Sequence, residues 1–204
     1  MTDQSHLPFS PAAERNQSAI LEVIGPRLRS RQSVLEIGAG TGQHAVALAR
    51  ALPHLTWTAS DVELSQSGLV DRLQASDLAN LNAPLVLDVN QFDWLNHDVR
   101  YEAAFSANTL HIMAEPEIET LFAGLPNVLT LDATMIFYGP FKMQGAFIGP
   151  SNAAFDASLR ARGVGSAIRD REWIESLADA QGFTLCDDVA MPANNQCLIF
   201  QRVA

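Results

Sequence analysis

The sequence has little cysteine and no long apolar run. The two cysteines, Cys186 and Cys197, are too few for a disulfide framework or for a zinc site made of cysteine alone. No apolar run approaches the ~18 residues that a membrane-spanning helix needs. The first residues carry neither the basic nor the apolar region of a secretory signal. These absences predict a cytoplasmic protein that does not bind membranes.

Basic residues are also scarce. Lysine and arginine number 13 against 23 aspartates and glutamates, which gives a formal net charge of −10. A chain this acidic repels phosphate backbones at long range, so nucleic acid is not an expected partner. With 204 residues, of which 48% are hydrophobic, the chain is long enough to bury a sizeable core. We therefore expect a single domain over residues 1–204, and the composition does not indicate its oligomeric state.

Short apolar runs alternate with helical patterns along most of the chain. The expected strands are residues 33–37, 55–59, 84–87, 103–107, 135–138, 183–191 and 196–202. The expected helices are residues 11–24, 45–52, 69–78 and 173–180, and a further helix is expected to start over residues 116–122. This alternation predicts an α/β fold with a mostly parallel sheet and right-handed crossovers. The last two strands follow each other directly, which predicts a hairpin in which one strand runs antiparallel.

Two segments stand outside this alternation. The N-terminal helical segment covers residues 8–30, with Ser10 as its N-cap and Pro11 at the first helical position. The connection over residues 139–170 is ~30 residues long, whereas most connections have ~2–6. Because long connections are usually functional, we predict that it forms a lid over the acceptor part of the binding site, closed jointly with residues 8–16.

A glycine-rich turn separates the first predicted strand from the helix after it. Its glycines are Gly38, Gly40 and Gly42, and such residues let the backbone turn sharply and let a ligand approach closely. The dinucleotide fingerprint G-x-G-x-x-G would need a glycine where Gln43 stands. The spacing therefore disfavours a nicotinamide-dependent oxidoreductase, which is kept as an alternative.

Together with Glu36, two positions before it, this turn resembles motif I of the class I S-adenosylmethionine-dependent methyltransferases. The resemblance implies a Rossmann-like, doubly wound sheet of seven strands, with S-adenosylmethionine as cofactor and S-adenosylhomocysteine as product. It implies that Glu36 and the three glycines belong to the cofactor site. It also implies that Asp61 binds the ribose hydroxyls, that Asp88 binds the adenine amino group, and that Asn108 faces the methionine part and the acceptor.

Six segments are similar to one small, largely uncharacterised methyltransferase-like family, known mainly as a domain of unknown function. They are SPAAERN (10–16), GTGQHA (40–45), YGPF (138–141), SNAAFD (151–156), IRD (168–170) and MPANN (191–195). The family has no known substrate, so the resemblance implies fold and cofactor only. The chain departs from the family pattern at residues 162–166, which bears on the acceptor pocket, and at residues 131–133, where a Pro-Gly-Gly turn is expected.

Two residues are candidates for catalysis. His111 lies three positions after Asn108 and is the best-placed general base; alternatively, it bonds to backbone at a helix start. Tyr138 ends a predicted strand at the same edge and is a candidate for catalysis or for orienting the acceptor. His44, in the first turn after the glycines, is more typical of a wall residue. None of the five histidines stands at a metal-ligand spacing with acidic residues, so no metal is expected.

Several candidates also have structural interpretations. Glu36 lies inside an apolar strand, where a carboxylate needs partners, either the N-terminal helix or the amides of the glycine turn. Asp61 can be a helix N-cap before Val62, and Asp88 can stabilise a loop.

The cysteines and a group of arginines have interpretations unrelated to catalysis. Both cysteines are expected to pack in the apolar interior. Arg160, Arg162, Arg169 and Arg171 are expected to form a solvated face or local ion pairs. Their alternative role is to recognise an anionic acceptor.

The predicted function is methyl transfer from S-adenosylmethionine to a small molecule with a nucleophilic oxygen, nitrogen or sulfur. Residues 108–111 read Asn-Thr-Leu-His, whereas many enzymes that methylate bases or amides carry Asn/Asp-Pro-Pro-Tyr/Phe there. The alternative is a non-catalytic protein that binds S-adenosylmethionine or S-adenosylhomocysteine and acts through a protein partner.

Overall fold

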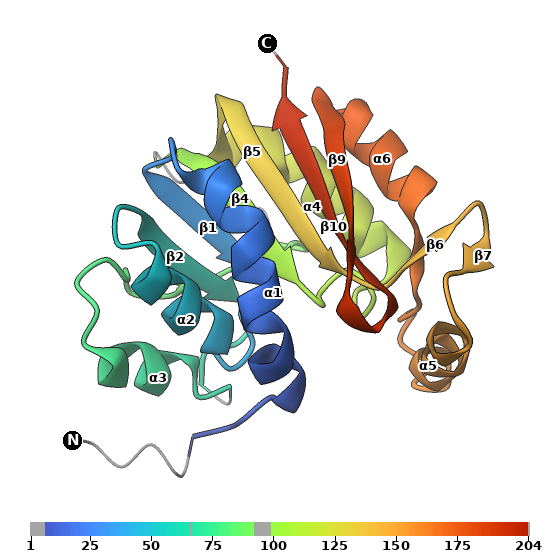
Figure 1. Ribbon diagram of the computed structural model, residues 1–204, viewed down its shortest axis with the longest axis horizontal. Helices are drawn as coiled ribbons and strands as arrows, with labels where there is room; N and C mark the ends of the chain where they lie inside the picture. The colour runs from blue at the N-terminus through green and yellow to red at the C-terminus, as the bar shows by residue number, and fades with distance from the viewer. Residues whose placement is uncertain (1–6, 66, 92–98, 204) are drawn as a thin grey trace.

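The computed structural model describes residues 7–65, 67–91 and 99–203, and its centre is a seven-stranded sheet (Figure 1). The strand order is β3-β2-β1-β4-β5-β10-β9. The strands are β1 (Ser33–Ile37), β2 (Thr56–Asp61), β3 (Leu85–Val86), β4 (Tyr101–Ala107), β5 (Leu129–Gly139), β9 (Phe183–Met191) and β10 (Asn195–Arg202). The first five strands pair in parallel, whereas β10 lies antiparallel between β5 and β9. This arrangement confirms the predicted sheet and its C-terminal hairpin.

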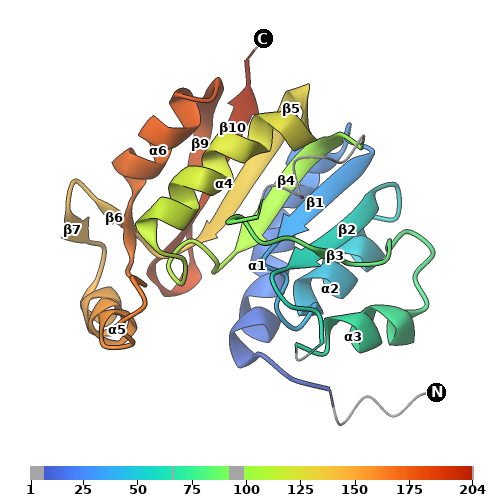
Figure 2. The same cartoon turned by 180° about the vertical axis from the view of Figure 1, so that it is seen from behind.

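Helices cover both faces of the sheet, as the doubly wound prediction requires. The helices α1 (Pro11–Leu28), α2 (Gln43–Ala51) and α3 (Leu69–Ser76) cover one face (Figure 1). The helices α4 (Glu115–Val128) and α6 (Arg171–Asp179) cover the other (Figure 2). Each face buries its own apolar cluster. On the face covered by α1 and α2, Trp57 and Phe105 meet edge to face. On the other face, Phe122 of α4 stacks on Phe137 of β5.

Two helices continue through a proline. The helix α1 does not stop at residue 24, as predicted, but includes Pro26 and ends at Leu28. The helix α4, whose first part was predicted at residues 116–122, also includes Pro126 and ends at Val128. A proline inside a helix costs ~3 kcal/mol. The turns that contain these prolines bury Leu28, Leu125 and Val128 in the core, and burying such a side chain contributes ~1.5–3 kcal/mol. Tertiary packing therefore offsets the local cost.

The strand β5 is longer than predicted and contains a bulge. It begins at Leu129, not at residue 135. Tyr101 of β4 faces Leu129, but Ala103 already faces Thr134, so residues 130–133 have no regular partner on β4. The expected turn at residues 131–133 is therefore a bulge within β5. Such a bulge accommodates extra residues on one strand while the pairing with the neighbouring strand continues on either side.

Residues 139–170 form a small folded unit. It contains a three-stranded sheet of β6 (Phe141–Met143), β7 (Ala146–Phe147) and β8 (Arg169–Asp170), and the helix α5 (Pro150–Arg160). The Asn152 side chain donates to the Asn194 carbonyl (3.0 Å), and Asp156 accepts from the Ile168 amide (2.7 Å). The unit lies beside the carboxyl ends of the parallel strands (Figure 1). A lid motion would have to break these anchoring bonds. The single-domain prediction also covers residues 1–6, 66, 92–98 and 204, which lie outside the described residues.

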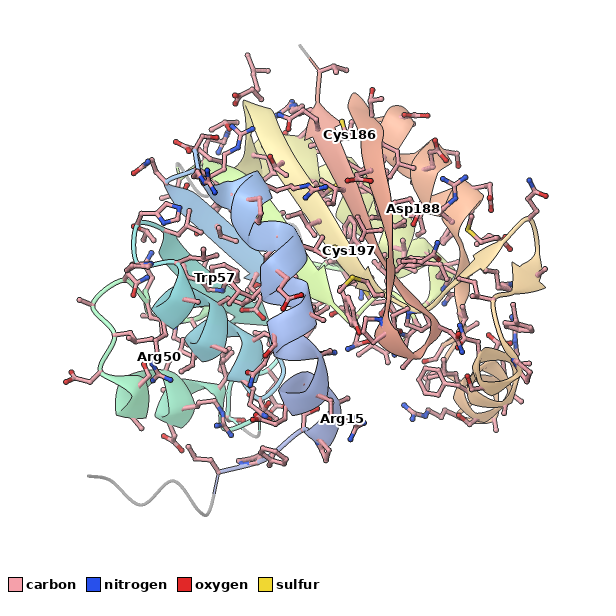
Figure 3. The ribbon with its side chains drawn as sticks, viewed as in Figure 1. Arg15, Arg50, Trp57, Cys186, Asp188 and Cys197 are labelled. Carbon is pink, nitrogen blue, oxygen red and sulfur yellow. The ribbon has the colours of Figure 1, made fainter. Side chains whose placement is uncertain are left out.

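The two cysteines differ in burial. Cys197 on β10 is buried, and burial raises the pKa of its thiol to about 12. Cys186 is exposed, so its predicted packing in the interior was wrong. It lies on β9, the edge strand, which is fully buried only at its two ends. Figure 3 shows the two cysteines on neighbouring strands.

Two kinds of feature are not found in the part of the chain that the structure describes. No helix there combines the length and the apolar character needed to cross a bilayer. No three His, Cys, Asp or Glu side chains there come together in a group that could hold a metal ion.

Candidate functional site

A cavity of about 490 Å³ opens at the carboxyl ends of β1, β2, β3 and β4. Its volume lies within the range of ~300–1,000 Å³ that is usual for small-molecule sites. Five of the predicted site residues line it, namely Gly38, Gly40, Asp61, Asp88 and Asn108. The other four, Glu36, Gly42, His111 and Tyr138, are not among its lining residues. The fold therefore brings together the predicted strand-end residues, whereas the two catalytic candidates do not line this cavity.

The glycine turn shapes the cavity in two ways. Gly38 has a φ of +70°, and a Cβ atom there would lie 2.5 Å from the Thr109 hydroxyl, so only glycine lets the loop after β4 pack this closely. Gly40 has a φ of +54°, and nothing lies within 4 Å of the position its Cβ would take. Gly42 precedes α2, where a Cβ would meet Leu69. Gly38 and Gly42 thus serve packing, whereas Gly40 keeps the cavity wall open.

Asp61 joins the end of β2 to the glycine turn. Its Oδ2 accepts from the Gly40 amide (2.6 Å), and its Oδ1 accepts from the Val62 amide (2.8 Å). A carboxylate has about four lone-pair positions, so Asp61 retains capacity for two ligand hydroxyls on the cavity side. It is not a helix N-cap, because the next helix, α3, begins only at Leu69.

Asp88 both stabilises its loop and lines the cavity. Its Oδ1 accepts from the Asn90 amide (2.9 Å), and its Oδ2 accepts from the Gln91 side chain (3.0 Å). The ligand-binding and loop-stabilising interpretations of Asp88 are therefore compatible, because lone pairs remain on both oxygens.

Glu36 is a buried acid that bridges β1 and β2. Its Oε2 accepts from the Trp57 indole N–H (2.7 Å), so its partner is neither the N-terminal helix nor the glycine turn. Figure 3 labels Trp57 on β2, behind α2. Burial raises the pKa of Glu36 to about 8, with the Trp57 bond acting in the opposite direction and the charge of Asp61 adding to the rise. The side chain is therefore mainly uncharged at pH 7 and supports the strand pair.

Asn108 lies where β4 and β5 end together. It has a φ of +61°, a left-handed conformation that asparagine tolerates better than most residues, and its amide donates to the Tyr138 carbonyl (2.8 Å). A Cβ atom on Gly139 would lie 3.8 Å from both Asn108 Oδ1 and His111 Nδ1. The end of β5 thus brings His111 to the neighbourhood of Asn108.

His111 is a buried, neutral imidazole. Burial lowers its pKa to about 4, and the charges of Arg162 and Arg169 act in the same direction. Its ring meets the edge of Phe155 from α5, with 5.2 Å between the ring centroids. Within the described ranges it has no hydrogen-bond partner, so the backbone-bonded alternative is not observed.

Tyr138 and His44 belong to a chain of polar side chains beside the cavity. Tyr138 hydrogen-bonds to the side chains of Asn16 and Asn195, and burial raises the pKa of its hydroxyl against the effect of these bonds. His44 lines the cavity, and its Nε2 lies 2.7 Å from Asn16 Oδ1. Burial lowers the pKa of His44 to about 4. We call His44, Asn16, Tyr138 and Asn195 the polar chain.

The N-terminal segment over residues 8–16, which was predicted to help close the site, forms a wall of the cavity. Ser10 and Ala13 line the cavity. The side chain of Gln43 holds this segment, because it accepts from the Ser10 amide (2.6 Å) and donates to the Ser10 carbonyl (3.3 Å). Arg72 donates to the carbonyls of Thr41 and Pro8 and so ties the same segment to the glycine turn. These two holding roles of Gln43 and Arg72 were not predicted from the sequence.

Three of the four grouped arginines form ion pairs, as one interpretation predicted, and Arg162 is exposed. Arg160 and Arg171 pair with carboxylates of their own helices. Arg169 is buried, pairs with Glu115 (3.1 Å) and donates to the carbonyls of Met113 and Gly165. The prediction that Arg169 lies on a solvated face was therefore wrong. Its side chain holds together the two loops that contain Met113 and Gly165.

Solved structures share this fold. An O-methyltransferase family protein from Burkholderia thailandensis matches with a TM-score of 0.76 and 13% identity, over 95% of this chain and 60% of that chain. The S-adenosylmethionine-dependent methyltransferase SibL in its apo form matches with a TM-score of 0.76 and 20% identity, over 95% and 56%. Human N-acetylserotonin methyltransferase in complex with S-adenosylmethionine matches with a TM-score of 0.73 and 12% identity, over 95% and 55%.

These likenesses show the class I methyltransferase fold, and the chain spans a little over half the length of each of these proteins. A family model supplies the closer relationship. Residues 7–202 match the family described as protein of unknown function (DUF938). The chain therefore belongs to the DUF938 family.

Proposed function

We propose that this protein is an S-adenosylmethionine-dependent methyltransferase that acts on a small-molecule acceptor. The observation that carries the proposal is the cavity, where the glycine turn, Asp61 and Asp88 follow one another along the ends of β1, β2 and β3. Ligands of open α/β sheets bind at this edge. The fold of methyltransferases, one of them in complex with S-adenosylmethionine, supports the same cofactor here.

The lining residues fit the parts of this cofactor. Asp61 has free lone pairs for the two ribose hydroxyls, and Asp88 has them for the adenine amino group. Gly40 leaves room for the ligand to approach the backbone, Gly38 lines the cavity, and Asn108 faces the methionine half. Gly42 and Glu36 act indirectly, through the turn and the strand pair. When bound, S-adenosylmethionine supplies a methyl group on a positively charged sulfur.

The acceptor is proposed to bind next to Asn108. Where the methyl acceptor must lose a proton, His111 takes that proton, because its imidazole has a pKa of about 4 and is neutral at pH 7. Exposed Ile112 and Phe155 give this side an apolar surface. Tyr138 is proposed as a positioning residue, because its hydroxyl is engaged by Asn16 and Asn195.

The test is calorimetric titration with S-adenosylmethionine and S-adenosylhomocysteine, with NAD as the control ligand. We expect Asp61→Ala to weaken binding roughly 10- to 100-fold, because it removes charge-assisted bonds to the ribose. Asp71→Ala removes the same charge from an exposed position on α3 and is expected to leave binding unchanged. A wild-type protein that binds neither sulfur compound contradicts the proposal.

Turnover is tested separately. The protein is incubated with methyl-labelled S-adenosylmethionine and a small-molecule cell extract, and label is expected in a low-mass product. Binding without transfer to any acceptor would favour the non-catalytic alternative.

A further inference from the structure

The two ends of the cavity differ chemically, and this difference orients the proposed cofactor. Asp61 and Asp88 lie at the ends of β2 and β3, so the nucleoside half belongs on that side. The strand order β3-β2-β1-β4 then directs the amino-acid half toward β4 and α1. The lining residues there include Ala13, His44 and Asn108.

His44 presents an unpaired ring nitrogen at this end. Its Nε2 bonds to Asn16 Oδ1, whereas its Nδ1 has no hydrogen-bond partner among the described residues. Among the described residues, the side-chain nitrogen and oxygen atoms that are both unpaired and shielded from solvent belong to Thr130, Arg171 and Gln196. His44 is not one of these residues. The Nδ1 of His44 therefore keeps contact with open space, and the open space that His44 lines is the cavity.

The contact with Asn16 fixes which nitrogen of His44 carries the proton. The Nε2 of His44 lies 2.7 Å from Asn16 Oδ1, and an amide oxygen can only accept. The Nε2 therefore carries the hydrogen and donates it to Asn16. His44 consequently has a bare lone pair on Nδ1.

This lone pair suits a positively charged donor. Because burial lowers the pKa of His44 to about 4, the ring is neutral at pH 7 and does not repel a cation. Of the acidic lining residues, Asp61 and Asp88 lie at the nucleoside end. Glu117 lies toward the nucleoside end as well, because its Oε1 accepts from the side chain of Asn90, two residues after Asp88. At the amino-acid end, His44 Nδ1 and Asn108 Oδ1 are acceptors without a hydrogen bond among the described residues.

We propose that Nδ1 of His44 accepts a hydrogen bond from the ammonium group of the cofactor's amino-acid half. This inference rests on the proposed function and adds a specificity determinant to it. By this contact His44 distinguishes the complete cofactor from its nucleoside fragments.

The experiment compares S-adenosylhomocysteine with 5′-methylthioadenosine, which keeps the nucleoside and the thioether but lacks the amino-acid end. His44→Gln places its amide near Nε2, so it retains the bond to Asn16 but removes the acceptor at Nδ1. We expect it to weaken S-adenosylhomocysteine binding roughly 10- to 100-fold and to leave methylthioadenosine binding within about 2-fold. His44→Asn places an oxygen near Nδ1 and is expected to retain most of the affinity.

A matched control is Arg50→Ala, an exposed position on the same helix (Figure 3), for which both affinities should stay at the wild-type value. Equal weakening of both ligands in His44→Gln would make His44 a structural wall and overturn the inference. Unchanged binding of both would overturn it as well. Failure of the wild-type protein to bind S-adenosylhomocysteine is a different result, because it removes the proposed function itself.

Discussion

At the scale of single residues, three buried titratable groups give folding stability opposite pH dependences. The pKa values of His44 and His111 are lowered from 6.5 to about 4, so the unfolded chain binds more protons between these values. Stability therefore rises from pH 4 to pH 6.5. The pKa of Glu36 is raised from 4.5 to about 8, so the native state binds the extra proton and stability falls over that range. Below pH 6.5 the rise in stability from the two histidines exceeds the fall from Glu36. Above pH 6.5, of these three groups, only Glu36 still changes the stability.

We therefore expect the free energy of unfolding to peak near pH 6.5 and to decline toward pH 8. Glu36→Gln keeps an acceptor for the Trp57 indole but cannot ionise, so the decline should disappear. Urea unfolding at a series of pH values measures this. Glu22→Gln, at an exposed position on α1, should retain the decline. A Glu36→Gln protein with the wild-type slope would show that another group is responsible.

At the scale of elements, the segments similar to the known family meet around the cavity. Asn16 comes from α1, His44 from α2, Tyr138 from β5, and Asn195 from the start of β10. The strand-end residues were predictable, because parallel strands bring their carboxyl ends to one edge. The partners in the polar chain were not predictable, because these bonds join elements that only the tertiary fold brings together.

The misjudged end of α1 and the bulge in β5 have a related cause. Local propensity stops a helix at Pro26, whereas burial of Leu28 continues it. A pattern within one segment carries no information on what the rest of the chain packs against it.

The anchor of α5 gives a prediction for this element. Asn152 is 4% exposed and donates to the Asn194 carbonyl, so Asn152→Ala leaves that carbonyl without this partner and loosens the helix. Hydrogen–deuterium exchange should become faster over residues 150–160 and stay unchanged in β1 and β4. Ser158→Ala, at an exposed position on the same helix, serves as the comparison. Protection of α5 at the wild-type level in Asn152→Ala would place its anchor elsewhere.

At the scale of the whole molecule, a ligand that bridges the ends of four strands should stabilise the entire sheet. A ligand present at 100 times its Kd adds about 2.7 kcal/mol to the free energy of unfolding. For a chain of this size that corresponds to a rise in Tm of roughly 5–10 °C. We expect this rise with S-adenosylhomocysteine and none with NAD in a thermal unfolding assay. Asp61→Ala should show a smaller rise at the same ligand concentration, and an equal rise would place the ligand away from β2.

The contact between Asn16 and His44 also bears on how the protein folds during its synthesis on the ribosome. The two residues are 28 positions apart, so their contact needs only α1, β1 and α2. Contacts that close short loops form early, because little loop entropy is lost. A nascent chain can therefore assemble the glycine turn and orient the ring of His44 before Tyr138 and β10 are synthesised. On the proposed role of His44, selectivity for the intact cofactor is encoded in the first helices of the fold and not in its C-terminal hairpin.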